Sequence, residues 1–331
     1  MPRVEWYLET LMRYGVVAVA IGVLMFLTYR GLIAAGVRRP AATGFALILP
    51  WFLGFVIWNL FPLAASLYLS LTNYNILQTP EWVGLANYDR LLNNDPQFWA
   101  SLRLTMAYAA ITVPLGLVLA LVAATLLNQG VRGVGVWRTI YYLPAVLPAF
   151  VTALLWRFML LPTRSGLVNT ATEPVWSLFG DSGPRWFLDP NTVLWGFVIM
   201  SFWGVFGANT VIMLAGLKNI PRELYEAADV DGAGLMAKFR HITLPQLTPT
   251  LFYLLIMGII AGVQIFDQGL FVDVPRENFL NVYLYQQGFS FFNMGYASAI
   301  AWVTLVIILV LTLAVFRSSQ AWVYYEGEVQ K

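Results

Sequence analysis

Long apolar segments separated by shorter polar connections run through almost the whole chain. Seven of them approach or exceed the roughly 20 apolar residues that a membrane-spanning helix needs. They cover approximately residues 14–37, 43–72, 104–127, 137–156, 192–217, 245–272 and 294–316. The fourth is short because Arg138 and Arg157 bound it, and Arg30 interrupts the first. The pattern predicts an all-α protein that crosses a membrane repeatedly.

The first apolar segment admits a second interpretation, as a secretory signal peptide. Against this alternative, Glu5 and Glu9 accompany the basic residues before the apolar run, so its start carries no net positive charge. Arg38 and Arg39 follow the run, where a signal peptide would present a small-residue cleavage site. These features favour a retained helix with a basic cytoplasmic anchor.

Composition supports the membrane assignment and removes several kinds of chemistry. Hydrophobic residues make up 59% of the 331 positions and charged residues 11%, against roughly 25% charged residues in soluble domains. The chain has no cysteine and a single histidine, His241, so we expect no metal site and no histidine-based catalytic triad. The net charge of +2 gives no reason to expect a nucleic-acid partner. No Gly-x-x-x-x-Gly-Lys-Ser/Thr loop for binding ATP is present.

The charges of the connections predict how the chain is oriented. If the N-terminus lies outside, the inner connections carry basic residues at roughly twice the density of the outer connections. By the positive-inside rule we therefore expect an outer N-terminus and a cytoplasmic C-terminus. The predicted location is the inner (plasma) membrane, with lipid around the apolar helices.

The longest predicted cytoplasmic connection, residues 219–245, has the pattern of two short helices joined by a tight turn. Pro221 suits the first turn of a helix, where its missing N–H costs little. Gly232 and Gly234 allow a sharp turn after that helix. Pro245 is expected to end the second helix where the sixth apolar segment begins.

This connection also displays apolar side chains that a water-facing loop does not need. Leu235, Met236 and Phe239 form a predicted apolar knob among basic residues, and Tyr225 adds a further large side chain. One interpretation is a short amphipathic helix that inserts into a groove of a partner protein, with flanking charges fixing its register. The alternative is a helix that lies flat on the membrane surface. The physical pattern alone leaves both open.

The same connection resembles the signature loop of permeases in binding-protein-dependent ABC importers. The pattern is Glu-Ala-Ala, three residues, Gly, nine residues, Ile, one residue and Leu-Pro. Every position is matched, by Glu226, Ala227, Ala228, Gly232, Ile242, Leu244 and Pro245. Further stretches are similar to the carbohydrate-uptake branch, in the subunit type that serves as first permease of maltose and glycerol-3-phosphate systems. They are Leu-Thr-Asn-Tyr at 71–74, Trp-Val-Gly-Leu-Ala-Asn-Tyr at 82–88, Tyr-Leu-Pro at 142–144 and Gly-Tyr-Ala-Ser-Ala at 295–299.

The resemblance implies a six-helix importer permease core with one extra N-terminal transmembrane helix. The implied domains are 1–42, the extra helix and its cytoplasmic connector; 43–318, the permease domain with the coupling loop 219–245; and 319–331, a cytoplasmic tail. One stretch departs from the pattern, because relatives commonly carry Thr-x-Gly-Gly-Pro where this chain has Val-Asp-Val-Pro-Arg-Glu at 272–277. The departure bears on the solute and leaves the transporter class unchanged.

The resemblance also implies partners and a division of labour. The protein would be a transporter subunit, not an enzyme, that moves a sugar or sugar-like solute from an extracytoplasmic solute-binding protein into the cytoplasm. It would pair with a second permease subunit of the same family and with two copies of an ABC ATPase. It would bind no cofactor itself, since ATP and Mg²⁺ would be held by the ATPase. The coupling loop would present Glu226 to a basic residue of the ATPase and insert Leu235, Met236 and Phe239 into its cleft.

Polar residues on otherwise apolar helices are candidates for the solute pathway. Asp267 is the one acidic residue within a predicted span, and Gln264 lies three residues before it, so both are expected on one helix face. Amide and carboxylate groups suit the hydroxyl groups of sugars. Weaker candidates are Ser201, Asn209 and Gln268. Alternatively, Asp267 lies near the outer interface and pairs with Arg157, and both interpretations stay open.

An ion-coupled secondary carrier is the main alternative function. Such carriers usually contain more buried titratable groups and repeated halves with interrupted helices, whereas this sequence has one central acidic residue and no strong repeat. An intramembrane enzyme would need a catalytic pair of aspartates or a histidine-rich cluster, and the sequence offers neither. Dependence of uptake on an ATPase, not on a proton gradient, would separate the importer from the carrier.

Overall fold

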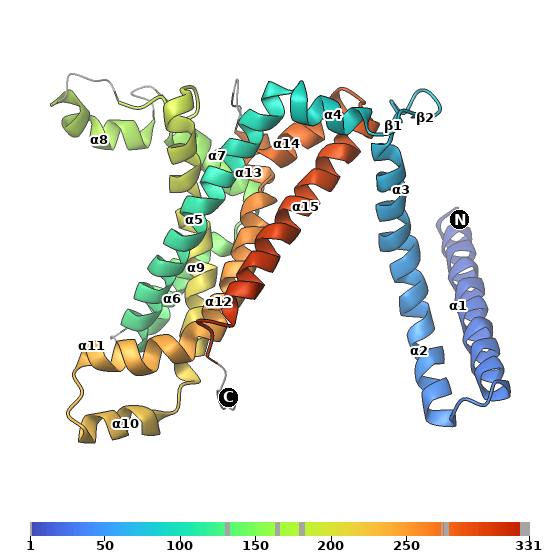
Figure 1. Cartoon of the computed structure of the whole chain (residues 1–331), viewed down its shortest axis with the longest axis horizontal. Helices are drawn as coiled ribbons and strands as arrows, with labels where there is room; N and C mark the ends of the chain where they lie inside the picture. The colour runs from blue at the N-terminus through green and yellow to red at the C-terminus, as the bar shows by residue number, and fades with distance from the viewer. Residues whose placement is uncertain are drawn as a thin grey trace. The chain divides into compact units, whose positions relative to one another are not determined.

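The computed structural model of the chain consists almost entirely of helices (Figure 1). It describes residues 2–129, 133–162, 166–178, 183–272, 274 and 278–324. In chain order, with η marking a π-helical turn, the elements are α1 (Pro2–Ala34), α2 (Arg39–Phe55), η1 (Val56–Leu60), α3 (Phe61–Ser70), β1 (Thr72–Asn73), β2 (Glu81–Trp82), α4 (Ala86–Asn93), α5 (Pro96–Asn128), α6 (Val134–Val146), α7 (Ala149–Met159), α8 (Leu167–Ser177), α9 (Pro190–Lys218), α10 (Arg222–Val230), α11 (Leu235–Lys238), η2 (Phe239–Thr243), α12 (Leu244–Val263), α13 (Asp267–Phe271), α14 (Leu280–Tyr285), η3 (Gln286–Ser290) and α15 (Met294–Ser319).

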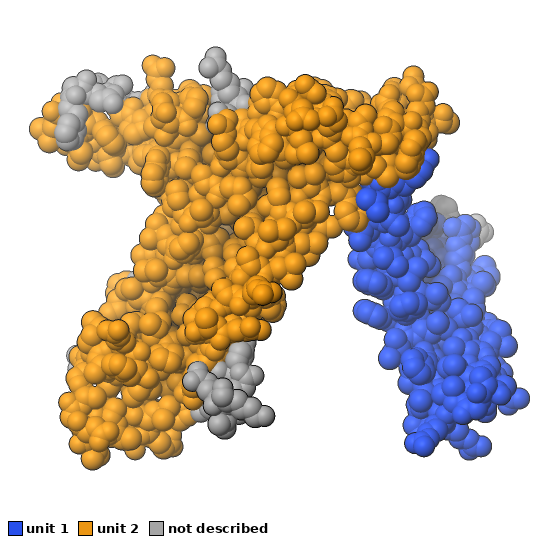
Figure 2. Space-filling model, in the orientation of Figure 1, with its two compact units in different colours: residues 1–69 blue, residues 70–331 orange. Residues whose placement is uncertain are grey.

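Two compact units divide the chain, residues 1–69 and residues 70–331 (Figure 2). The first unit contains α1 and the long helix that follows it, so it includes both the predicted extra helix and the first helix of the predicted permease domain. The second unit contains the remaining helices, the short strands β1 and β2 and the predicted coupling loop.

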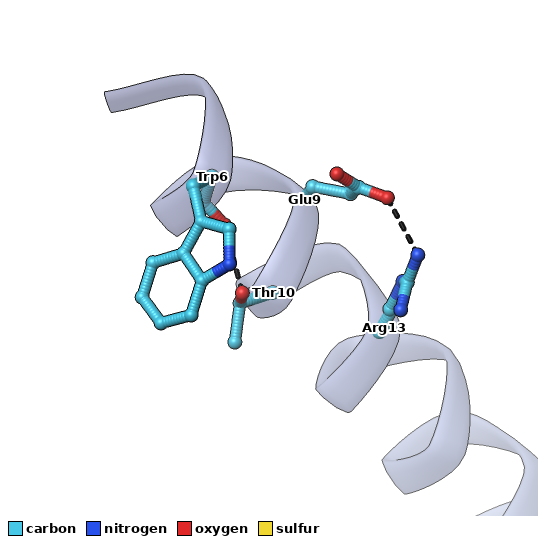
Figure 3. A network of polar contacts seen from close by, with 4 residues as sticks. All are labelled: Trp6, Glu9, Thr10 and Arg13. Carbon is cyan, nitrogen blue, oxygen red and sulfur yellow. Dashed lines mark hydrogen bonds and ion pairs between the residues drawn. The ribbon is translucent and has the colours of Figure 1, made fainter. Parts of the chain in front are cut away.

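α1 is one continuous helix that accommodates Arg30 without a break. Near its start, Arg13 forms an ion pair with Glu9, four residues earlier, at 2.6 Å between Nη2 and Oε1 (Figure 3). The hydroxyl group of Thr10 donates to the backbone carbonyl of Trp6 in the same turn. The two charges neutralise each other next to the apolar run. This agrees with the sequence, in which the segment before that run carries no net positive charge.

The second helix of the first unit passes a proline without breaking. α2, η1 and α3 are continuous from Arg39 to Ser70. Pro62 follows the π turn η1 by two residues. A proline has no backbone N–H, and its ring clashes with the carbonyl group one turn earlier. We interpret the wider π turn as the local adjustment that relieves this clash.

Five helices within the described residues are long and apolar enough to cross a membrane. They are Trp6–Ala34, Arg39–Ser70, Pro96–Asn128, Leu235–Phe271 and Met294–Ser319. A sixth span is obtained when Pro190–Gly204 and Gly207–Lys218, which meet at an angle of 48°, are taken together. These helices confirm six of the seven predicted segments, and the chain is a multi-pass membrane protein.

The fourth predicted segment, residues 137–156, is not one span. It is divided between α6 and α7, and Leu147 between them has extended backbone angles, φ −71° and ψ 137°. The next residue is Pro148, and a proline disfavours helical angles at the residue before it. The prediction of a single helix was wrong because this proline ends α6.

The second unit is a helical bundle in which α5 packs along both α9 and α12. Two glycines bring α5 and α12 close together. A Cβ atom at Gly258 would lie 2.9 Å from Cγ1 of Val113, and one at Gly262 would lie 3.1 Å from Cβ of Ala109. Small residues at such crossings let membrane helices approach closely and gain dispersion contacts. α15 also packs against α12.

The stretches at 71–74 and 82–88 have a structural role. β1 pairs with β2 in antiparallel register, with Thr72 opposite Trp82. The side-chain amide of Asn87 donates to the backbone carbonyl groups of Ser70 and Thr72, each at 2.9 Å. The hydroxyl groups of Tyr88 and Ser70 are also hydrogen-bonded, at 2.8 Å. The Asn87 side chain thus satisfies the carbonyl groups of Ser70 and of Thr72 in β1.

The C-terminal end of the described chain folds back onto α12. The backbone N–H of Tyr324 donates to the hydroxyl group of Thr248 at 2.8 Å. The ring of Trp322 lies 6.0 Å from that of Phe252, in an edge-to-face arrangement. The rest of the predicted tail, residues 325–331, lies outside the described residues.

The buried carboxylate of Asp95 connects several elements at the end of the bundle where α4 and α14 lie (Figure 1). Asp95 caps α5 by accepting from the backbone N–H of Phe98, and its other oxygen accepts from the hydroxyl groups of Tyr283 and Tyr296. Burial raises the pKa of Asp95, but the hydrogen bonds from the two tyrosines and from backbone N–H groups together outweigh it, so the pKa lies below its usual value. The guanidinium group of Arg90 stacks over the ring of Tyr296 at 4.2 Å.

We expect Asp95→Asn to destabilise the second unit by about 1–3 kcal/mol, since it weakens hydrogen bonds to buried donors. The measurement is the apparent melting temperature of the purified chain, with Asp89→Asn on the exposed face of α4 as the matched control. Because the folded-state pKa is lowered, the carboxylate stabilises the fold above about pH 4 and loses this contribution as the pH falls through the folded value. An equal effect of both substitutions at pH 7 would contradict the role of Asp95.

Candidate functional site

The predicted coupling loop is a helical hairpin at the end of the second unit opposite α4 (Figure 1). α10 forms the first arm, with Pro221 directly before it and Glu223 in its first turn. Gly232 lies in the turn with φ +74°, in the left-handed region that favours glycine. Gly234 has φ −72° and ψ 168°, which any residue adopts. The prediction of helix, turn and helix is therefore confirmed, but only Gly232 needs to be glycine.

The second arm does not end at Pro245, contrary to the prediction. α11, η2 and α12 form one continuous helix that begins at Leu235. As at Pro62, a π turn ends two residues before the proline, and its wider turn makes room for the ring. The hairpin is therefore a direct extension of the membrane-spanning helix.

The residues of the signature divide into an outward and an inward group. Glu226 and Ala227 are exposed on α10, and the carboxylate of Glu226 has no hydrogen bond or ion pair with any described residue. Ala228, Leu244 and Pro245 are half-buried. Ile242 packs against a buried cluster formed by α5, α9 and α12.

The predicted apolar knob is smaller than expected. Leu235 is 87% exposed and Met236 76% exposed, which is unusual for large apolar side chains outside lipid. Phe239, the third predicted member, is half-buried because it belongs to the π turn that leads into α12. The tip of the hairpin therefore offers these two adjacent apolar side chains to a partner or to a lipid surface, together with Val230 at the end of α10, which is 89% exposed.

A cavity of about 210 Å³ lies between α5, α9 and α12. Most of its wall is apolar. Its polar lining residues are Tyr108, Thr112, Asn209 and Gln268. The amide of Asn209 has no hydrogen bond with any described residue, so it is available to a solute.

Three polar side chains from different helices meet beside this cavity. The hydroxyl groups of Tyr108 on α5 and Ser201 on α9 are hydrogen-bonded to each other. Both hydroxyl oxygens also lie near Oε1 of Gln268 on α13, at 3.4 Å from Tyr108 and 3.1 Å from Ser201, and Ser201 lies 2.7 Å from the carbonyl group of Phe197. Each hydroxyl group has one proton, so these contacts are alternatives for it. Two of the predicted pathway residues, Asn209 and Gln268, thus line the cavity, and a third, Ser201, is buried beside it in contact with Gln268.

Tyr108 was not predicted as a pathway residue. The chain has 16 tyrosines, and nothing in the sequence around Tyr108 distinguishes it from the others. Thr112, one turn further along α5, was missed for the same reason. Only the packing of α5 against α9 and α12 shows that these two side chains face a cavity.

The prediction that Gln264 and Asp267 share a helix face was wrong. α12 ends at Val263, and Phe266 has φ −135° and ψ −62°, so the helix is interrupted before α13 begins at Asp267. The side-chain amide of Asn281 donates to the carbonyl group of Gln264 at 2.9 Å and satisfies the open end of α12. Neither residue lines the cavity.

The alternative for Asp267, a pair with Arg157, is also not formed among the described residues. The guanidinium group of Arg157 instead lies 3.4 Å from the backbone carbonyl of Phe271. Of the departing stretch 272–277, residues 273 and 275–277 lie outside the described part of the chain. The described residues contain no group of three or more histidine, cysteine or acidic side chains that could hold a metal ion.

A multi-pass bundle with a partly polar cavity between its helices, and with a hairpin extending from one of those helices, suits a membrane transport subunit. The chain belongs to the family of binding-protein-dependent transport system inner membrane components, which its residues 112–323 match.

Relatives match most of the length of the chain. A probable ABC transporter permease of Bacillus subtilis, YesP, is 38% identical over 299 residues, which is 88% of this chain and 95% of the relative. The arabinooligosaccharides transport system permease AraP of the same organism is 32% identical over 84% of this chain and 88% of its own length. The trehalose/maltose transport system permease MalF of Thermococcus litoralis is 31% identical over 84% of this chain and 94% of its own length.

A solved structure shares the fold. A chain of a bacterial ABC transporter involved in the import of the acidic polysaccharide alginate superposes with a TM-score of 0.72 at 23% identity. The match covers 83% of this chain and 94% of that chain. The likeness confirms the predicted helical permease architecture.

Proposed function

We propose that this chain is the permease subunit of an ATP-driven importer that moves a sugar or sugar-like solute from an extracytoplasmic binding protein into the cytoplasm. One observation carries the proposal: the family signature lies on a protruding hairpin that exposes Leu235 and Met236 and continues directly into a membrane-spanning helix. The names of AraP and MalF, which refer to arabinooligosaccharides and to trehalose and maltose, support the solute class. The ion-coupled carrier finds no support among the relatives named above.

The hairpin couples the permease to an ABC ATPase. Exposed apolar side chains on a short helix suit insertion into the cleft of a partner, and the free carboxylate of Glu226 suits a basic residue beside that cleft. ATP and Mg²⁺ belong to two copies of the ATPase. A second permease of the same family completes the pathway. This assembly requires the hairpin and the C-terminus to be cytoplasmic and the N-terminus to be outside.

The cavity is part of the solute pathway. Its volume of about 210 Å³ is below the roughly 300–1,000 Å³ of sites for drug-sized ligands, so in this conformation it suits one small unit, such as a single sugar ring. The free amide of Asn209 and the polar groups of Tyr108 and Gln268 offer donors and acceptors to sugar hydroxyl groups, and Ser201 holds Gln268 from behind. Gln264 and Asp267 lie outside the cavity and carry no role in this proposal.

Reconstitution tests the proposed function. The chain, a second permease and an ATPase in proteoliposomes, supplied with binding protein and labelled oligosaccharides, are expected to accumulate solute only when ATP reaches the ATPase. Omission of the ATPase is expected to abolish uptake, and a proton gradient is expected to have no effect. Uptake by the permease alone, driven by a proton gradient, would support the carrier and contradict the proposal.

Asn209→Leu is expected to lower the rate of ATP-dependent uptake about tenfold, because leucine keeps a similar volume and removes the hydrogen bonds to the solute. The control is Asn128→Leu at the exposed end of α5, which is expected to transport normally. ATP hydrolysis without binding protein is expected to be unchanged in both. Normal uptake by the Asn209 variant over a range of oligosaccharides would exclude a solute contact at this position.

A further inference from the structure

Two polar contacts join the arms of the coupling hairpin, and we call them together the clasp. In the first, the hydroxyl groups of Tyr225 on α10 and Thr243 in η2 are hydrogen-bonded at 2.9 Å. In the second, the ammonium group of Lys238 at the end of α11 forms an ion pair with the carboxylate of Asp229 on α10. Neither contact involves a residue of the family signature.

The π turn η2 sets the register of the clasp. Tyr225 and Asp229 are four residues apart, so they lie on the same face of α10. Their partners Lys238 and Thr243 are five residues apart, and the Thr243 hydroxyl group lies 3.5 Å from the carbonyl group of Lys238. In a regular α-helix five residues correspond to a rotation of about 140° beyond one turn, which would place the partners on different faces. The π turn brings residues five apart into line.

The clasp connects an exposed tip to a buried core. The Lys238 side chain is only 16% exposed although it is charged, and Thr243 is buried. Tyr225 and Ile242 pack against the cluster of buried residues from α5, α9 and α12. The first contact therefore lies at the base of the hairpin, while the second lies nearer to the exposed Leu235 and Met236.

We propose that the clasp holds the two arms of the hairpin as one rigid lever, so that α10, which carries Glu226, moves together with α11 and α12 when the hairpin is displaced. Tyr225, Asp229, Lys238 and Thr243 are positioning residues, and they act through the arms and not by contact with solute or nucleotide. The proposal rests on the proposed function, since it concerns how the same hairpin passes on movement of the ATPase. With the clasp open, α10 yields at the turn, and ATP is hydrolysed with less solute moved.

A double-mutant cycle tests the first contact. Tyr225→Phe and Thr243→Val each remove one hydroxyl group with little change of volume, and each is expected to lower the solute transported per ATP hydrolysed about two- to tenfold. The double variant is expected to be no worse than the poorer single variant, because both remove the same hydrogen bond. Tyr253→Phe, on the exposed face of α12, is the matched control and is expected to be normal. Unchanged single variants, or effects that multiply in the double variant, would overturn the role of this contact.

An exchange of charges tests the second contact. Asp229→Lys and Lys238→Asp each place like charges opposite one another and are expected to lower the transport ratio, whereas the combined exchange restores it. An effect of either residue that does not depend on their pairing predicts no such restoration. Failure of the combined variant to recover would count against the clasp.

A distance measurement on the full chain in lipid nanodiscs, without ATPase, separates this inference from the proposed function. Spin labels on Val230→Cys at the exposed end of α10 and Asn128→Cys at the end of α5 are expected to give a narrow distance distribution, which broadens in Tyr225→Phe combined with Asp229→Asn. Equal widths would overturn the lever while leaving docking untouched. Conversely, failure of the unmodified chain to bind any ATPase would overturn the proposed function, whatever the width of the distribution.

Discussion

Glu226→Lys is expected to abolish ATP-dependent uptake while the protein still inserts into the membrane. The carboxylate is exposed and has no partner among the described residues, so its reversal costs the fold little. A lysine there would face a basic residue of the ATPase, and a like-charge contact across an interface costs several kcal/mol. We therefore expect loss of ATPase binding. The measurements are uptake in proteoliposomes and co-purification of the ATPase with the permease.

Glu223→Lys provides the matched control, because it makes the same change of charge three residues earlier on α10. Its expected cost is limited to the helix dipole, typically about 0.3–1 kcal/mol, so uptake should remain above half of the wild-type rate. Normal uptake by the Glu226 variant, with the ATPase still bound, would remove this residue from the docking surface.

Gly232→Val is expected to lower uptake about tenfold or more. Gly232 has φ +74°, and left-handed angles cost a residue with a Cβ roughly 1–2 kcal/mol, with β-branched residues the most strongly excluded. No atom lies within 4 Å of a Cβ at this position, so the effect is expected to come from backbone strain and not from a steric clash. The turn would rearrange, and the two arms would lose their register.

Gly234→Val, two residues later, tests this reasoning. Gly234 also has open space around it but adopts ordinary extended angles. The variant is expected to transport at nearly the wild-type rate. Equal loss at both positions would show that the turn needs small side chains for docking, and equal tolerance would show that the turn conformation is irrelevant.

A membrane-spanning helix could be predicted from the sequence wherever an apolar segment was long enough. The effect of each proline on its helix could not be predicted. Pro148 ends a helix, whereas Pro62 and Pro245 follow π turns inside continuous helices. All three are the same residue in an apolar context. Three further prolines, Pro50, Pro114 and Pro249, lie inside α2, α5 and α12 with neither a break nor a π turn directly before them. The presence of a proline alone therefore does not determine what happens to its helix.

The functional site likewise has one part that depends on a short stretch of sequence and another that depends on contacts between distant residues. The hairpin could be predicted because its signature, turn and exposed residues lie within one short stretch, 219–245. The cavity could not, because Tyr108 and Gln268 are 160 residues apart and meet only through the packing of α5, α9 and α13. The error at Gln264 and Asp267 arose from assuming a continuous helix across residues 264–266, where the backbone is interrupted.

Labelling of a single cysteine at the tip of the hairpin tests the central claim most directly. The chain has no native cysteine, so Met236→Cys provides a unique thiol at an exposed position. A membrane-impermeant maleimide is expected to label it in inverted vesicles but not in intact cells, and bound ATPase is expected to protect it. Labelling from outside intact cells, or labelling in inverted vesicles that bound ATPase leaves unchanged, would contradict a cytoplasmic hairpin that docks on the ATPase.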